Sequence, residues 1–332
     1  MPSTRLTELL GIDRPIVGAP MAGTATAPLA AAISAAGGFG TIGASTSRWT
    51  ADRPDWLRAQ IRAVRRVTDR PFGVGFILSY PNADDLVAVA IAERVAALCL
   101  SFGDPAPFIA DARAAGIKTL VQVQTLAQAR AAAAAGADAI AAQGAEAGGH
   151  TGALGTLSFV PAAVDAVSPL PVIAAGGIAD GRGLAAALML GAEGVWMGTR
   201  FVASVEWEGE AWRKDRVAAA STDDTIWTLA YDLASELPFP DGIGGRVLRN
   251  AFTDAWHGRE AEIAGRRVEL QRQLETAETD ADPRDAAVWA GSGAGLIHAV
   301  EPAADIVRRV VAEAERCLAR WGARVGAGPK DG

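Results

Sequence analysis

The sequence is poor in the residues and patterns that mark several large classes of protein. Its 332 residues include only two cysteines, Cys99 and Cys317, which lie far apart and outside any metal-type spacing. We therefore expect no disulfide framework and a reducing compartment. No uninterrupted apolar run reaches the roughly 20 residues that cross a bilayer, and the N-terminus lacks the apolar segment of a signal peptide. These absences predict a soluble, cytoplasmic protein with no membrane partner.

Basic charge and metal motifs are equally scarce. The chain has 31 Lys and Arg against 38 Asp and Glu, a formal net charge of −7, and no basic run stands out. This balance argues against nucleic acid as a partner. No Walker A pattern, H-E-x-x-H, G-x-S-x-G or Cys/His ligand cluster occurs, so we expect no metal site.

What the sequence does have is a regular alternation of short apolar runs and amphipathic helical patterns. This rhythm is typical of βαβ units and a parallel sheet. The expected strands are residues 15–17, 39–42, 72–76, 95–100, 118–123, 139–142, 172–174 and 194–197. Eight strands, each followed by a helix, predict a TIM (β/α)8 barrel. An open doubly wound sheet is the alternative, but no G-x-G-x-x-G follows the first strand.

The rhythm changes after Phe201. The following segment is rich in Trp, Arg and Glu with helical spacing. We expect residues 205–287 to form a mainly helical inserted cap, and residues 1–204 and 288–322 to form the barrel. Within the second barrel segment, residues 302–321 read as one amphipathic helix that closes the barrel.

Two glycine loops follow the seventh and eighth expected strands. They are Gly176-Gly177 and Gly198-Thr199, at the place where TIM barrels usually bind phosphate. Loops of bare backbone expose N–H groups, and we expect a helix N-terminus below each loop to add to the attraction for an anion. The alternative is a pair of ordinary tight turns.

One histidine lies in a third glycine loop, E-A-G-G-H-T-G. Imidazole suits proton transfer near neutral pH, so we predict that His150 is a site residue, the alternative being a solvated loop histidine. Glu146 either orients this imidazole or pairs with a basic residue elsewhere. We do not expect the other two histidines, His257 and His298, to contact the site.

Smaller signals point to the same end of the barrel. In the G-A-P-M-A-G segment after the first strand, Pro20 fixes the backbone and Met21 can lie against a flat ring. Gln122 and Gln124 share one face at the end of a strand, where buried amides need polar partners. A simple turn and a water-filled barrel top are the respective alternatives.

Together these segments resemble a known family. G-A-P-M-A, S-F-G-D-P, A-Q-G-A-E-A-G-G-H-T-G, I-A-A-G-G-I-A-D-G and M-G-T-R-F-V-A-S are similar to motifs of the nitronate monooxygenases, formerly called 2-nitropropane dioxygenases, over nearly the whole chain. The resemblance implies an FMN-dependent TIM barrel. It places the phosphate on Gly176, Gly177, Gly198 and Thr199 and the flavin ring over Ala19, Pro20 and Met21, with Gln122 at the polar edge. The adjoining Ala175, Gly148 and Gly149 are further expected FMN contacts.

The resemblance also implies a reaction. His150 matches the family histidine that removes a proton next to a nitro group or positions the anionic nitronate, a small-molecule substrate that is oxidised with molecular oxygen. One position departs from the family, because many members have asparagine where this chain has Gly75.

Two other functions stay open. Related flavin-dependent enoyl reductases share the G-G-H and A-A-G-G-I segments, so an NAD(P)H-dependent enoyl or quinone reductase is the first alternative. A flavin-free barrel that binds a phosphorylated metabolite is the second. The sequence also leaves open a homodimer, the physiological substrate and whether the cap is a moving lid.

Overall fold

Eight parallel strands form a barrel in the computed structural model, which describes residues 1, 3–46 and 50–326. Their order is β1-β9-β8-β6-β5-β4-β3-β2, and a parallel bridge between Val17 and Phe39 joins the two outer strands. The strands are β1 (Ile16–Gly18), β2 (Gly40–Gly43), β3 (Phe72–Ile77), β4 (Ala97–Ser101), β5 (Lys118–Val123), β6 (Ala139–Gln143), β8 (Val172–Ala175) and β9 (Gly194–Met197). The predicted TIM barrel is confirmed, and each predicted strand is present within two residues of its expected limits.

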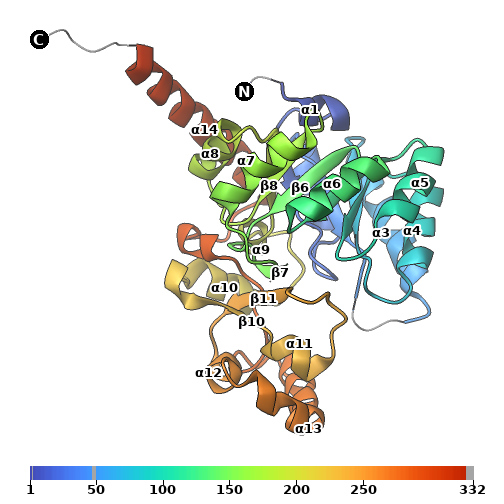
Figure 1. The fold of residues 1–332 in the computed structure, drawn as a ribbon, viewed down its shortest axis with the longest axis vertical. Helices are drawn as coiled ribbons and strands as arrows, with labels where there is room; N and C mark the ends of the chain where they lie inside the picture. The colour runs from blue at the N-terminus through green and yellow to red at the C-terminus, as the bar shows by residue number, and fades with distance from the viewer. Residues whose placement is uncertain (2, 47–49, 327–332) are drawn as a thin grey trace, which may run out of the picture.

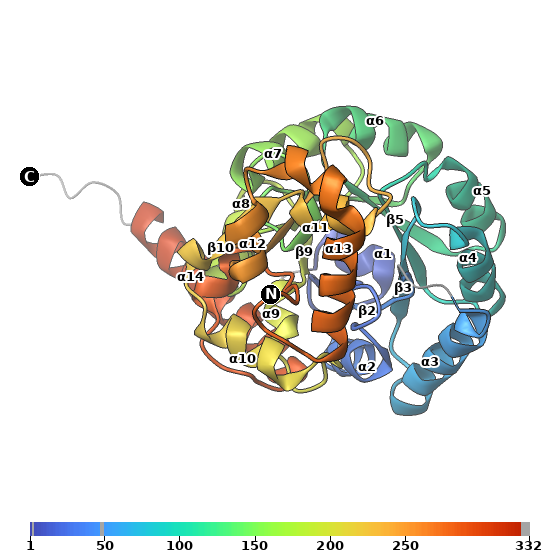
Figure 2. The same ribbon diagram turned by 90° about the horizontal axis from the view of Figure 1, so that it is seen from below.

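A ring of helices surrounds the strands (Figure 2). The closing helix α14 packs against both α8 and α2, so it completes the ring as the sequence predicts. The ring consists of α2 (Ala27–Ala35), α3 (Arg53–Val67), α4 (Ala83–Ala92), α5 (Ala106–Ala114), α6 (Leu126–Ala135), α7 (Thr156–Val167), α8 (Gly181–Met189) and α14 (Ala303–Gly326). A short α9 (Thr199–Val202) follows β9 directly.

Helix α6 shows how the local sequence sets these boundaries. The side chain of Thr125 accepts a hydrogen bond from the backbone nitrogen of Gln128. In turn, the side chain of Gln128 accepts one from the backbone nitrogen of Thr125. This capping box begins the helix. Gly136 ends it with a φ of 90°, a left-handed conformation that glycine adopts without strain.

Two apolar layers hold the barrel together. One fills its interior with residues such as Leu120 and Ile173, and α1 (Arg5–Leu10) closes one end by burying Leu6 among them. The second, larger layer lies between the strands and the surrounding helices. Within the described ranges, no helix combines the length and apolarity needed to span a bilayer.

The inserted segment covers the other end of the barrel (Figures 1 and 2). We call residues 205–287 the cap, in line with the predicted division. It contains α10 (Ala211–Ala219), η1 (Thr222–Asp224), β10 (Thr225–Thr228), α11 (Ala230–Ser235), β11 (Gly244–Leu248), α12 (Ala251–Trp256) and α13 (Glu260–Thr279), and η2 (Ser292–Leu296) follows it. A separate apolar core, which includes Phe252, Ile263 and Leu270, holds it together.

The sequence did not predict the two cap strands. β11 pairs with β10 on one side and with β7 (Gly149–Thr151) on the other, and this places His150 opposite Gly245. Each cap strand is only four or five residues long, too short for its alternation to stand out from the helical pattern around it. The resulting antiparallel sheet joins the cap to the loop that carries the histidine.

Candidate functional site

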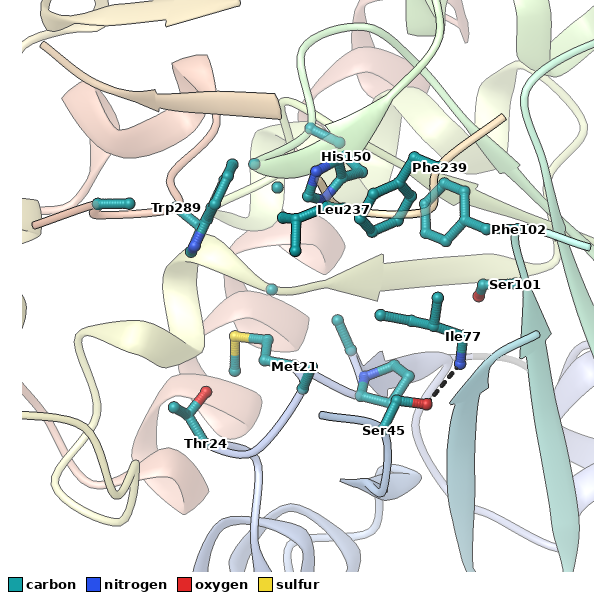
Figure 3. Close-up of a pocket in the computed structure, with 18 of the residues that line it drawn as sticks. Met21, Thr24, Ser45, Ile77, Ser101, Phe102, His150, Leu237, Phe239 and Trp289 are labelled. Carbon is teal, nitrogen blue, oxygen red and sulfur yellow. Dashed lines mark hydrogen bonds between the residues drawn. The ribbon is translucent and has the colours of Figure 1, made fainter. Parts of the chain in front are cut away.

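A cavity of about 1060 Å³ lies between the carboxyl ends of the barrel strands and the cap. This volume is at the upper end of the range for small-molecule sites, roughly 300–1,000 Å³. Figure 3 shows Met21, Thr24 and Ser45 along one side of the pocket and His150, Leu237 and Trp289 along the opposite side. The cavity is therefore lined from below by barrel loops and from above by the cap and its neighbouring loops.

Ala19, Pro20 and Met21 line the barrel side of this cavity. A Cβ atom added to Gly75 would lie only 2.1 Å from Cβ of Pro20. The Pro20 ring therefore occupies the space that a side chain at position 75 would need, which gives a structural reason for the glycine that departs from the family pattern.

The two glycine loops that were predicted to bind phosphate lie together in the cavity wall. Gly176 and Gly177 have φ values of 103° and 73°, and Gly198 and Thr199 lie beside them in the lining. A Cβ atom on Gly176 would be 2.9 Å from the carbonyl oxygen of Gly144, so a larger residue does not fit there. Within the described ranges, the backbone N–H groups of Gly177 and Gly198 have no recorded hydrogen-bond partner. Free amides of this kind can bind an anion.

A helix begins after each of the two loops, as the sequence predicts. α9 begins at Thr199, directly after Gly198. The first amides of α8 are already bonded: Gly181 N donates to Oε2 of Glu313 at 3.1 Å, and Arg182 N donates to Oδ1 of Asp180 at 2.9 Å. Two carboxylates therefore accept hydrogen bonds from the first amides of α8, the helix that begins after Gly176-Gly177.

Asp180 is a charged helix cap. Burial acts to raise the pKa of its carboxyl group, but hydrogen bonds from Arg182 and Gly183 outweigh burial and lower the pKa from its usual value. This carboxylate stabilises α8 and the turn that follows Gly177.

A third glycine loop completes this wall. Gly148 and Gly291 face each other so closely that a Cβ atom on Gly148 would lie 2.5 Å from the nitrogen of Gly291. Gly291 N donates to Oγ1 of Thr199 at 2.9 Å, and Gly149 has a φ of 74°. The predicted contacts Gly148, Gly149 and Ala175 all line the cavity.

The two glutamines after β5 have different positions. Gln122 lines the cavity, and its Oε1 accepts a hydrogen bond from the Ser101 hydroxyl at 2.8 Å. Gln124 is buried outside the lining, where its Nε2 donates to Gln143, which in turn donates to the carbonyl oxygen of His150 at 3.0 Å. Gln122 can therefore contact a ligand, whereas Gln124 supports the histidine loop.

The imidazole of His150 is almost fully enclosed. Its Nε2 lies 2.7 Å from Oδ1 of Asp232, and only 11% and 9% of the two side chains are exposed. The ring of Phe239 stacks on the imidazole, with centroids 3.4 Å apart and planes 11° apart, and Trp289 lies 5.0 Å away (Figure 3). This environment excludes the solvated-loop interpretation of His150.

The sequence analysis missed Asp232, Phe239 and Trp289. Asp232 is 82 positions from His150, and its only local signal is a single acid within the apolar stretch L-A-Y-D-L-A. Buried acids need partners, so that pattern could have marked it.

Glu146 does not orient the histidine. Its carboxylate accepts hydrogen bonds from the backbone nitrogen and the hydroxyl of Thr156, at 2.9 and 2.8 Å, and so it binds the first turn of α7. His257 lies 3.7 Å from Glu260, and both His257 and His298 are exposed and outside the cavity lining, as expected.

A closed parallel barrel, with glycine loops after its last two strands and a buried imidazole beside them, is the arrangement of an enzyme site that can bind an anionic group next to a group able to accept a proton. The model of the family described as nitronate monooxygenase matches residues 3–93 and 82–313. The chain belongs to the nitronate monooxygenase family, and it is a flavin oxidoreductase.

Individual relatives agree on the class of enzyme but differ in the reaction that their names give. Nitronate monooxygenase of Pseudomonas aeruginosa is 35% identical over 93% of this chain and 98% of its own length. A (3aS,4S,5R,7aS)-5-hydroxy-7a-methyl-1-oxo-octahydro-1H-indene-4-carboxyl-CoA dehydrogenase of Mycobacterium tuberculosis is 39% identical over 76% of this chain and 67% of its own length. The solved structure of FabK from Thermotoga maritima has a TM-score of 0.87 and 38% identity, and the match covers 98% of this chain and 100% of FabK.

Proposed function

We propose that the protein is an FMN-dependent oxidoreductase that oxidises an alkyl nitronate, or a similar stabilised carbanion, with molecular oxygen. The observation that carries the proposal is the imidazole of His150, which lines the cavity and pairs with the buried Asp232, together with the glycine loops at Gly176-Gly177 and Gly198 in another part of the cavity wall, which we call the glycine cradle. The imidazole can accept a proton, and the cradle can bind a phosphate.

The described residues fit FMN. The unpartnered amides of Gly177 and Gly198, with Gly176 and Thr199 beside them, would bind its phosphate. The floor formed by Ala19, Pro20 and Met21 would support the flat ring, while Gln122 would face its polar edge. When bound, FMN supplies a two-electron acceptor that molecular oxygen can reoxidise.

In this proposal the chain's own residues bind and orient the substrate and move one proton. His150 takes the proton from the carbon next to the nitro group or holds the nitronate that results. Phe102, Phe239 and Trp289 enclose this position and keep bulk water away from the carbanion.

Absorbance spectroscopy tests the proposal directly. The purified protein should be yellow, and its visible flavin absorbance should bleach when an alkyl nitronate is added without oxygen. Oxygen should then restore the colour. A yellow protein whose flavin stays oxidised with a panel of nitronates would contradict the assigned substrate class.

A second function deserves the same measurement. The apolar side chains of Phe102, Leu237, Phe239 and Leu274 line the cap side of the cavity, and such a surface also suits the hydrocarbon part of an acyl substrate. The FabK and CoA-dehydrogenase relatives agree with that interpretation. If the protein is an enoyl or quinone reductase, NADPH without oxygen should reduce the flavin rapidly, whereas we expect only slow reduction. A colourless protein that retains no FMN after reconstitution would favour the flavin-free alternative instead.

A further inference from the structure

The cap contributes a buried carboxylate to a histidine that the barrel contributes. Asp232 lies on α11, and the distance of 2.7 Å from its Oδ1 to Nε2 of His150 is that of a short hydrogen bond. An ionised carboxylate can only accept hydrogen bonds. Nε2 must therefore carry a proton in this pair.

The two ring nitrogens therefore differ in protonation. In a neutral imidazole with its proton on Nε2, the lone pair is on Nδ1. Nδ1 has no hydrogen-bond partner in the part of the chain that the structure describes. Nδ1 is thus the ring atom that is free to accept a proton.

The rest of the cap holds this arrangement in place. β11 pairs with the strand that contains His150, and Trp227 Nε1 donates to the carbonyl oxygen of Thr151 at 3.3 Å. Phe239 stacks on the imidazole face and limits its rotation. Three parts of the cap therefore fix the imidazole: the backbone of β11, the ring of Phe239 and the carboxylate of Asp232.

Among the described residues, no other group competes with His150 for a hydrogen bond to Asp232. Its Oδ2 is buried and without a hydrogen bond among the described residues. The other titratable group close to it on the barrel side is Tyr80, which lines the same cavity. Burial raises the pKa of Tyr80 to about 12, and the charge of Asp232 contributes to this rise. Tyr80 therefore stays neutral near pH 7 and adds no second negative charge beside the carboxylate.

We propose that Asp232 is the positioning residue of this site: it holds His150 with the proton on Nε2, so that the imidazole acts on the substrate through Nδ1. This inference deepens the proposed function and rests on it for the catalytic part. The tautomer itself is a property of the chain that can be measured without turnover.

The first experiment reads the tautomer. The whole chain is labelled with ¹⁵N-histidine, and the nitrogen chemical shifts are recorded for flavin-free protein near pH 8. The chain has three histidines, so the His150 signals are those absent from His150→Gln. We expect Nε2 to be protonated and Nδ1 to be bare. In Asp232→Asn the amide can donate or accept, so this preference should weaken to a mixture. A proton on Nδ1 in the unmodified protein, or identical His150 spectra in Asp232→Asn, would overturn the proposal.

The second experiment separates positioning from packing. With the neutral nitroalkane as substrate, from which a proton must be removed, Asp232→Asn should lower kcat roughly 10- to 100-fold, the size expected for loss of one charge-assisted hydrogen bond, with little change in KM. Asp232→Glu should recover part of that loss because it keeps an acceptor. Asp254→Asn, which changes an exposed carboxylate on the neighbouring α12, should have no effect. Thermal unfolding and bound flavin are measured for each variant to confirm that it folds.

The two proposals can fail separately. A wild-type protein without nitronate turnover would contradict the proposed function, while the tautomer measurement would still decide the role of Asp232. Nitroalkane turnover that is unchanged in a folded Asp232→Asn would contradict the positioning role alone.

Discussion

The two walls of the cavity are built by different means. The barrel wall presents backbone: Gly176, Gly177 and Gly198 bring amides to the surface at positions where a side chain would obstruct them. The opposite wall presents side chains: Asp232 and Phe239 of the cap, and Trp289 just beyond the cap, pack around one imidazole. In the proposed function, the barrel wall would bind the cofactor and the side chains around His150 would act on the substrate, so substitutions should be able to separate the two.

The histidine gives the largest expected effect and the sharpest test of that separation. His150→Ala should lower turnover with the neutral nitroalkane, from which a proton must be removed, by about 10²- to 10⁴-fold, the contribution typical of a general base. Bound FMN should stay near the wild-type level because the glycine loops are unchanged. Steady-state kinetics and the visible spectrum measure the two quantities, and His257→Ala, an exposed histidine on the cap, is the matched control. Loss of flavin together with turnover would remove the distinction between the two walls.

Gly177→Ala changes the barrel wall, and here we expect weaker FMN binding. Its φ of 73° is unfavourable for alanine, and the new Cβ would lie 3.2 Å from Cβ of Glu146. A shifted amide should weaken FMN binding by roughly 10-fold, equal to about 1.4 kcal/mol, in a fluorescence titration of the flavin-free protein.

Gly116→Ala is the control for Gly177→Ala. Gly116 has the same φ of 73°, with no atom within 4 Å of its added Cβ and no place in the cavity lining. It should lower thermal stability by a similar amount and leave FMN affinity unchanged. Equal affinity loss in both variants would mean that general destabilisation, rather than the cradle, controls FMN binding.

The variant Gly75→Asn tests how tightly the barrel side of the cavity is packed around Pro20. Gly75→Asn places a side chain where the Pro20 ring lies, and overpacking of this kind typically costs about 1–3 kcal/mol of unfolding free energy. Urea unfolding measures the cost. The double variant with Pro20→Ala should recover part of the stability, and a single variant as stable as wild type would show that the Pro20 turn moves freely.

The smallest expected effect concerns Asp180 below the glycine loops. Asp180→Ala removes the cap of α8 and should cost about 1 kcal/mol at neutral pH. The pKa of Asp180 is lowered in the folded protein, so its stabilising contribution is present above the pKa of an unfolded aspartate, near 3.9, and is lost as the pH falls through the folded value. Urea unfolding at pH 7 and at lower pH should show the difference between variant and wild type shrinking on acidification. A constant difference would mean that the charge does not contribute.

Much of the barrel could be predicted because the residues that determine each strand and helix lie close together in the sequence. The apolar run of β5 and the capping box and terminal glycine of α6 lie within 20 residues of one another. Parallel strands have their carboxyl ends at the same end of the barrel. The sequence therefore predicted that the loops containing Gly176 and Gly198 lie close together. The contact of Glu313 with the start of α8 could not be predicted in this way, because Glu313 comes from the far end of the chain.

The sequence by itself determined the alternation that makes a barrel, the glycine loops at its mouth and the histidine beside them, since each depends on neighbouring residues and on the fixed geometry of parallel strands. Only the tertiary structure decided what the histidine contacts. Asp232, Phe239 and Trp289 reach it through the fold of the cap and the pairing of β11 with β7, contacts that span 80 to 140 residues and leave no periodic pattern in the chain. Burial then makes these contacts strong, because a carboxylate and an imidazole removed from water stabilise each other more than they would at the surface.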